Sequence, residues 1–147
     1  MEKISNPISF SLKRITTEQF AIVEGISINT KEIDIIVSLR FAVDPEPKII
    51  VAYTLFKFEC EGKVFMIIEA GCHFIVDEKA WNRFAIDKKV KIDKGFLSHI
   101  AMITVGTSRG ILHAKTEGTP YNEFVLPTIN VLEMIQEDIV FDLLQPV

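Results

Sequence analysis

The stretch FLSHIAMITVGTSRGILHA, residues 96–114, decides the fold because it is apolar on more than one side of the helix that its spacing predicts. Its single formal charge is Arg109. A helix that is apolar nearly all round must be buried nearly all round, and a small domain has too few other elements to bury it alone. The stretch therefore predicts that the chain forms an oligomer.

Two apolar stripes run along this predicted helix at steps of three, four and eight residues. One stripe can pack on the sheet of the same chain while the other meets a partner subunit. The first stripe comprises Phe96, Ile100, Ile103, Ile111 and Ala114, and the second comprises Leu97, Ala101, Val105 and Leu112. We place the oligomer interface at Leu97, Ile100, Ala101, Val105, Arg109 and Leu112.

Arg109 has two interpretations. In the first, it is an interface arginine that pairs with a carboxylate or with carbonyl groups at a helix end. In the second, it is a surface arginine whose aliphatic stem covers apolar neighbours. The first is slightly favoured, because Arg109 is the lone charge of the helix.

Composition excludes several classes of protein. Polar residues interrupt the apolar run well before the roughly 20 residues that a bilayer requires, so a membrane span is excluded. The net charge of −4 gives no basic surface for nucleic acid, and favours a basic or unfolded polypeptide as the ligand. The length suits a single domain over residues 1–147. The first ten residues lack a hydrophobic signal core, which predicts a cytoplasmic protein.

Alternation of apolar and polar residues predicts strands before the long helix. The predicted strands cover residues 8–15, 33–43, 48–60 and 63–76, and residues 16–31 form a long crossing segment. Residues 77–93 are expected to be irregular, with a short helical turn or loop anchored by Trp81 and Phe84. The long helix should begin at Asp93 and stop before Gly118. A second helix follows Pro127, and residues 137–147 extend it or fray.

The predicted hairpin places its residues on two faces. A two-residue turn at Glu61 and Gly62 sets Cys72 opposite Val51, far from Cys60, so no disulfide is expected. In this register one face carries Phe56, Phe58, Phe65 and Ile67, and the other carries Tyr53, Leu55, Met66, Ile68, Cys72 and Phe74. Both faces are largely apolar, so the face that the helix leaves open must meet a second layer, the crossing segment or a ligand.

No catalytic arrangement emerges from the residues. His99 and His113 lie about 21 Å apart along the helix, and Cys72 and His73 point to opposite faces of a strand. The sequence has no phosphate-binding loop, dinucleotide glycine motif, zinc-ligand pattern or nucleophile elbow. We therefore expect no enzyme, no metal and no cofactor. A small-molecule site that includes His73 or His99 remains the alternative.

Apolar residues in the irregular segments are candidates for a binding groove, because fewer of them are needed to pack the core. They are Phe20, Ile22, Tyr121, Phe124 and Leu126.

The order of elements and two local motifs resemble the SecB export chaperone family and its SecB-like relatives. Thr107-Ser108-Arg109-Gly110 is similar to the family's arginine-glycine step at the end of its long helix. Phe124-Val125-Leu126-Pro127-Thr128-Ile129-Asn130 is similar to the loop before its last helix, and residues 10–15 are similar in pattern to its first strand.

The resemblance implies an α+β fold, in which a four-stranded antiparallel sheet packs on one long helix and a short C-terminal helix follows. It implies dimers, often paired into a dimer of dimers through the long helices. It also implies a holdase that binds unfolded or extended polypeptides without ATP. The binding residues would lie in residues 20–28, 121–126 and 132–135. They are Phe20, Ile22, Ile26, Tyr121, Phe124, Leu126, Leu132 and Ile135.

Two departures from the family bear on the client. Residues 85–94 are rich in lysine and lack the cysteine-proline and tyrosine-alanine-arginine pattern of export SecB. The ending Leu143-Leu144-Gln145-Pro146-Val147 has no basic or zinc-seeking tail, which makes docking to the SecA motor doubtful. A dedicated client such as an antitoxin is thus as consistent with the sequence as general export. The alternative is a structural or assembly protein that uses this fold only to oligomerise.

Overall fold

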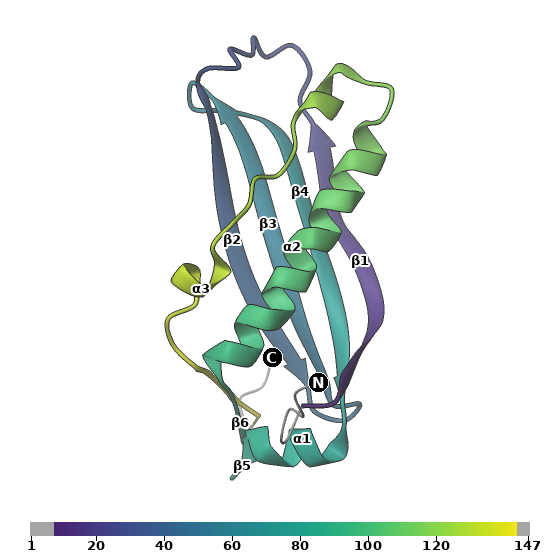
Figure 1. Cartoon of the computed structure of the whole chain (residues 1–147), viewed down its shortest axis with the longest axis vertical. Helices are drawn as coiled ribbons and strands as arrows, with labels where there is room; N and C mark the ends of the chain where they lie inside the picture. Colours follow the sequence, from purple (N-terminus) through teal and green to yellow (C-terminus); the bar gives the residue numbers. More distant parts are fainter. Residues whose placement is uncertain (1–7, 144–147) are drawn as a thin grey trace, which may run out of the picture.

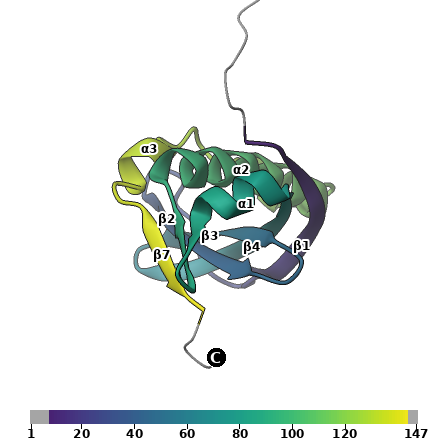
Figure 2. The same ribbon diagram turned by 90° about the horizontal axis from the view of Figure 1, so that it is seen from below.

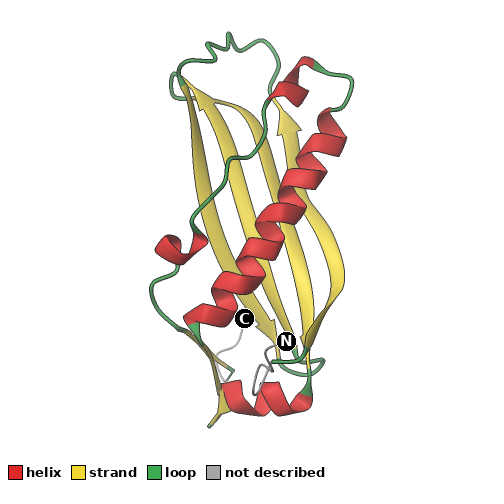
Figure 3. Cartoon of the chain, viewed as in Figure 1, coloured by secondary structure: helices red, strands yellow, loops and turns green. Residues whose placement is uncertain are grey.

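The computed structural model describes residues 8–143 and has an α+β architecture, as predicted. Four antiparallel strands in the order β1-β4-β3-β2 form a sheet, and the long helix α2 crosses one face of it diagonally (Figures 1 and 3). The strands of this sheet are β1 (Phe10–Ile22), β2 (Ile33–Asp44), β3 (Ile49–Cys60) and β4 (Lys63–Val76). The helices are α1 (Glu78–Phe84), α2 (Lys94–Thr116), the 3₁₀ helix η1 (Pro120–Glu123) and α3 (Val131–Met134).

Strand β1 is longer than the sequence pattern predicted. It runs to Ile22, so the crossing segment shrinks to residues 23–32. The register between β1 and β4 shifts twice, between Leu12 and Arg14 and between Thr17 and Gln19. The second shift interrupts the alternation of apolar and polar residues within residues 16–22, which explains why their pattern did not predict a strand.

The predicted faces of the β3–β4 hairpin are correct for Phe65, which packs against Phe58, but are wrong by one residue for β4 from Met66 onward. The turn at Glu61 and Gly62 forms as expected, but a register shift follows it, and Phe58 then pairs with Met66. Cys72 consequently lies opposite Ala52 instead of Val51. The shift moves the even-numbered residues of β4 onto the face that carries Phe56 and Phe58. Both cysteines remain buried free thiols, as predicted.

The core lies between this face of the sheet and α2. It contains the largest fully buried side chains of β3 and β4, which are Ile50, Phe56, Phe58, Phe65, Met66, Ile68 and Phe74. From α2 it receives Leu97, Ile100 and Leu112. One polar pair lies within it: Thr54 Oγ1 of β3 and Ser108 Oγ of α2 are 2.6 Å apart, and both residues are completely buried. Ser108 also donates to the carbonyl of Thr104, at 3.0 Å.

The helices all lie on one side of the sheet (Figure 2). On the opposite face, long side chains of the sheet pack against one another. The Tyr53 ring lies over Gly71, where an added Cβ would come within 2.9 Å of the ring. The guanidinium of Arg40 stacks 3.6 Å from the ring centroid and lies 3.5 Å from the Glu69 carboxylate. His73 meets the ring edge-on, and its pKa is lowered by burial and by the charge of Arg14. This face therefore meets no second layer of the described chain.

Residues 77–93 are more regular than predicted. Asp77 caps α1, which buries Trp81 and Phe84 as expected. The rest forms strands β5 (Ala85–Ile86) and β6 (Lys89–Ile92), which pair with β7 (Ile139–Asp142) in a small antiparallel sheet. The prediction that residues 137–147 extend the last helix or fray is thus wrong for residues 139–142, because Val90 and Ile92 form a ladder with them. Residues 144–147 lie outside the described part of the chain.

None of the helices within residues 8–143 combines the length and the hydropathy that crossing a membrane requires.

Candidate functional site

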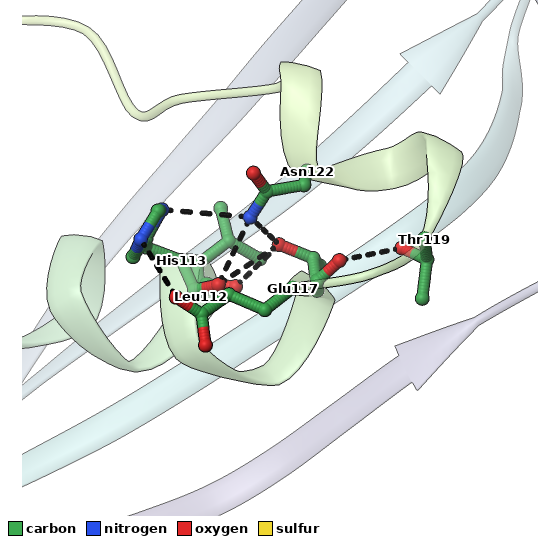
Figure 4. Close-up of polar contacts among 6 residues, drawn as sticks. Leu112, His113, Glu117, Thr119 and Asn122 are labelled. Carbon is green, nitrogen blue, oxygen red and sulfur yellow. Dashed lines mark hydrogen bonds and ion pairs between the residues drawn. The ribbon is translucent and has the colours of Figure 1, made fainter.

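The end of α2 is fixed by a group of polar side chains (Figure 4). The amide of Asn122 donates to the carbonyl of His113 at 3.0 Å and to Thr116 Oγ1 at 3.1 Å. The Thr119 hydroxyl donates to the Thr116 carbonyl at 2.7 Å. These bonds satisfy carbonyl groups that a helix end leaves free. They also hold η1 against the end of α2.

An aromatic cluster continues from η1 onto the sheet. Phe124 packs against Phe65 with ring centroids 5.2 Å apart and against Phe58 at 6.2 Å. Tyr121 lies 6.5 Å from Phe65. Phe65 is completely buried, whereas Phe124 and Tyr121 are half-buried. The cluster therefore presents one side of each outer ring to solvent.

Arg109 holds the loop that follows. Its Nε donates to the carbonyl of Leu126, and its Nη2 donates to the carbonyl of Pro127, both at 3.0 Å. The prediction was an interface arginine that pairs with a carboxylate or with carbonyl groups at a helix end. The observed partners are carbonyl groups of a loop of the same chain. The guanidinium thus fixes residues 124–127 along the outer side of α2.

Three grooves lie around this helical layer. The loop groove, of about 420 Å³, runs between the outer side of α2 and the loop and is lined by Gly106, Arg109, Gly110, His113, Phe124 and Val125. The α3 groove, of about 430 Å³, lies beside the start of α2 and is lined by Lys94, Gly95, Ser98, Leu132, Ile135 and Gln136. The edge groove, also about 430 Å³, lies between β2 and the segment after α3, with Leu39, Phe41, Met134 and Glu137 among its lining residues.

The predicted binding residues fall into three groups. Five are half-buried: Phe20, Ile22, Ile26, Tyr121 and Phe124. Leu132 is 65% exposed and lines the α3 groove. Leu126 is only 2% exposed, and its prediction as a binding residue is wrong because the loop turns its side chain into the core. Ile135 is 8% exposed, yet it lines both the α3 groove and the edge groove.

Val125 and Met134 line grooves and lie within the predicted ranges 121–126 and 132–135, but neither was among the individual residues predicted to bind. Val125 is 61% exposed and Met134 is 42% exposed. Each neighbours a residue that was named, Leu126 and Ile135 respectively, and points to the opposite side of its segment. An irregular segment has no fixed period from which the outward residue could be read.

The predicted oligomer interface needs a correction. Leu97, Ile100, Ala101, Val105 and Leu112 are all between 0% and 4% exposed in the isolated chain. Their side chains pack on the sheet of the same chain, so they present no surface to a partner. The outward side of α2 carries instead His99, Met102, Gly106 and Gly110, of which Met102 is 55% exposed.

The described histidines lie apart from one another and contact other kinds of residue. Within residues 8–143, no group of three or more histidine, cysteine, aspartate or glutamate side chains could hold a metal ion. His99 packs edge-on against Phe10, and His113 lies 3.3 Å from the carboxylate of Glu117. What the site offers is apolar surface bordered by a few charges.

Replacing Arg109 by alanine should free the loop. The two hydrogen bonds from the charged guanidinium are lost and two carbonyls lose a partner, so we expect the free energy of unfolding to fall by about 1.5 to 3 kcal/mol. Limited proteolysis should then cut residues 124–127 faster than in the unchanged chain. Arg109→Lys, which keeps the charge but not the fork geometry, should behave more like alanine than like arginine. Equal cleavage rates in all three chains would contradict this role.

Comparisons with known proteins support the fold alone. No protein-family model matches the chain, and no curated protein matches its sequence. Seven chains of solved structures match it. One is the Mycobacterium tuberculosis SecB-like chaperone Rv1957, solved in complex with a ChAD peptide from the HigA1 antitoxin Rv1956. That match has a TM-score of 0.51 and 11% sequence identity, and covers 82% of this chain and 88% of the other. The chain thus has a SecB-like fold.

Proposed function

We propose that the chain is an ATP-independent holdase that binds unfolded or extended polypeptide segments in the grooves around α2. The observation that carries the proposal is the set of exposed apolar side chains beside these grooves, namely Val125, Leu132 and Met134. Each of the three lines a different groove of this helical layer, and apolar side chains exposed inside a concave surface are typical of a binding site. The fold shared with a chaperone solved in complex with an antitoxin peptide supports the proposal.

The mechanism is passive. An extended client buries its apolar side chains in the grooves, which gains about 25 cal/mol for each Å² removed from water, before the cost of ordering the client is subtracted. The sequence carries no phosphate-binding motif, so no nucleotide takes part in the proposal. A dedicated client such as an antitoxin and general export both fit this mechanism. We place the protein in the cytoplasm, and we assign it no SecA partner.

The proposed oligomer uses the surface where β1 lies along α2. Phe10 packs against Phe96 near one end of the helix, and Lys115 lies over Phe20 near the other. Leu12 and Ile15, between these contacts, are 43% and 50% exposed. Leu12 and Ile15 pair with Phe74 and Cys72, on the face of the sheet that α2 covers. The proposed surface consists of these two residues and of Met102 on the outward side of α2, and its burial by a second copy would give a dimer or a dimer of dimers.

Light scattering on the purified chain, alone and after addition of a reduced, unfolded test protein, tests both parts of the proposal. We expect an oligomer that captures the test protein without nucleotide. The double variant Val125→Glu, Leu132→Glu should bind the test protein at least about tenfold more weakly, because each charge would have to be desolvated in a groove. Both positions are exposed, so the fold should be retained.

The matched control is Ile86→Glu, which places the same charge on an apolar residue of the small sheet that is 63% exposed. It should leave capture unchanged. An oligomer that ignores the unfolded protein would favour the alternative, an assembly protein that uses the fold only to oligomerise. A monomer would refute the proposed surface between β1 and α2.

A further inference from the structure

Strand β2 has an unpaired edge. It is an outer strand of the sheet, and all twelve of its residues, Ile33–Asp44, pair with β3 without a register shift. No backbone hydrogen bond among residues 8–143 joins β2 to any segment other than β3. An outer strand leaves every second N–H and C=O without a partner in the sheet. β2 therefore offers a straight row of donors and acceptors.

This edge lacks three of the usual protections against pairing, although it carries the charged residues Asp34, Arg40 and Asp44. Outer strands are commonly shielded by proline, by lysine or by bulges. β2 contains no proline, no lysine and no bulge over its twelve residues. The other outer strand, β1, carries Lys13 and two register shifts. The two edges of one sheet thus differ, and the regular one is the better template for an added strand.

The edge groove runs beside this strand on its helical side. Leu39 pairs with Thr54, and Phe41 pairs with Ala52; both partners lie on the face that α2 covers. Leu39 and Phe41 are only half-buried, and the groove continues from them to Met134 and Ile135. Successive side chains of an added strand point to opposite faces. Every second one would enter this groove.

The charges near the groove indicate which strand fits. Glu137 lines it, Glu133 is exposed on the neighbouring α3, and neither carboxylate forms a salt bridge within the described residues. The edge groove is also lined by the positively charged Arg40, but its guanidinium is stacked on Tyr53 and lies beside the Glu69 carboxylate. The acidic rim attracts a segment with basic residues and repels the same rim of a second copy, since the whole chain carries a net charge of −4.

We propose that the β2 edge is a strand-addition site, where an extended client segment pairs as a fifth strand and inserts alternate apolar side chains into the edge groove. The segment carries basic residues on either side of its apolar positions. This inference rests on the proposed function and names the way in which a client is held. The backbone hydrogen bonds bind any extended sequence, whereas the groove and its acidic rim select among sequences.

The test uses a ten-residue peptide of alternating valine and threonine with lysine at each end, and hydrogen exchange of the full-length chain with and without it. On binding, we expect alternate amides of β2 to become protected, because those bonded to β3 are already protected. Two control peptides carry N-methyl groups on one or the other alternate set of amides. Only one of them should bind at least tenfold more weakly, since only one set faces β2.

The outcomes separate this inference from the proposed function. Binding that leaves the exchange of β2 unchanged and protects residues 124–126 instead would overturn strand addition but keep the holdase. Failure to bind either the peptide or an unfolded protein would overturn both. Protection of β2 that rises with the concentration of the chain alone would show that a second copy occupies the edge, which also overturns the inference.

Discussion

Ile100→Glu is expected to unfold the chain. Ile100 is completely buried on the side of α2 that packs on the sheet. A buried unpaired charge typically costs about 3 to 5 kcal/mol, in addition to the lost packing of isoleucine. Domains of this size have a total stability of about 5 to 15 kcal/mol. Circular dichroism should show a loss of folded structure, or urea unfolding should show a transition at a much lower urea concentration.

Met102→Glu is the matched control on the same helix. The side chain is 55% exposed, so the monomer should lose less than about 0.5 kcal/mol. If α2 and β1 form the oligomer surface, this variant should dissociate the oligomer while its far-ultraviolet spectrum is unchanged. A folded Ile100→Glu chain that merely becomes monomeric would restore the prediction made from the sequence, in which Ile100 faces a partner.

Phe65→Ala is expected to cost about 3 to 5 kcal/mol and to loosen the binding surface as well. Phe65 is completely buried and contacts three aromatic rings, those of Phe58, Phe124 and Tyr121. Its removal leaves Phe124 and Tyr121 without the ring on which they rest. Chemical denaturation should show the lost stability, and hydrogen exchange should show faster exchange in residues 120–126.

Phe65→Leu separates the two effects. Leucine keeps most of the volume and should cost less than half as much, with η1 still in place. If alanine and leucine weaken the chain equally, the contribution of Phe65 is ring contact and not filled space. If exchange in residues 120–126 does not change in the alanine variant, the aromatic cluster does not position η1.

The long helix and the four-stranded sheet could be predicted because their signals are local. The apolar stripes of residues 96–114 predict a helix. Asp93 is the N-cap residue of that helix, so the start of the helix could be predicted from the sequence. The sequence did not predict correctly which surface each side of this helix packs against. The same stripes fit the chain's own sheet or a partner equally well, and only the diagonal path of α2 across the sheet decides between them.

Register was less predictable than pairing. The turn at Glu61 and Gly62 was correct, but a single register shift after it exchanged the two faces of β4 from Met66 onward. Phe65 keeps its predicted face, whereas Met66 takes the buried position predicted for Ile67. A bulge leaves no clear signal in a strand where both faces are apolar. β7 was missed for a related reason, since four residues that pair with a distant short strand carry almost no pattern of their own.

Of the candidate site, the sequence indicated the segments better than the side chains. Loop residues 121–126 and the segment 132–135 do border grooves, yet Leu126 is buried while its neighbour Val125 is exposed. The direction of a loop side chain depends on where the loop is attached, here by Arg109. That contact spans seventeen residues and cannot be deduced from the spacing of apolar positions.

The buried pair of Thr54 and Ser108 has a consequence for how the helix is seated. A helix with apolar residues on several sides could slide along the sheet by one turn and still bury hydrocarbon. Only one position brings the two hydroxyls to 2.6 Å, and in any other the Thr54 hydroxyl would be stranded in the core at a cost of about 1 to 3 kcal/mol. The pair acts as a stop against sliding. Because Arg109 is the next residue, the same stop sets where the loop is attached and hence where the loop groove opens.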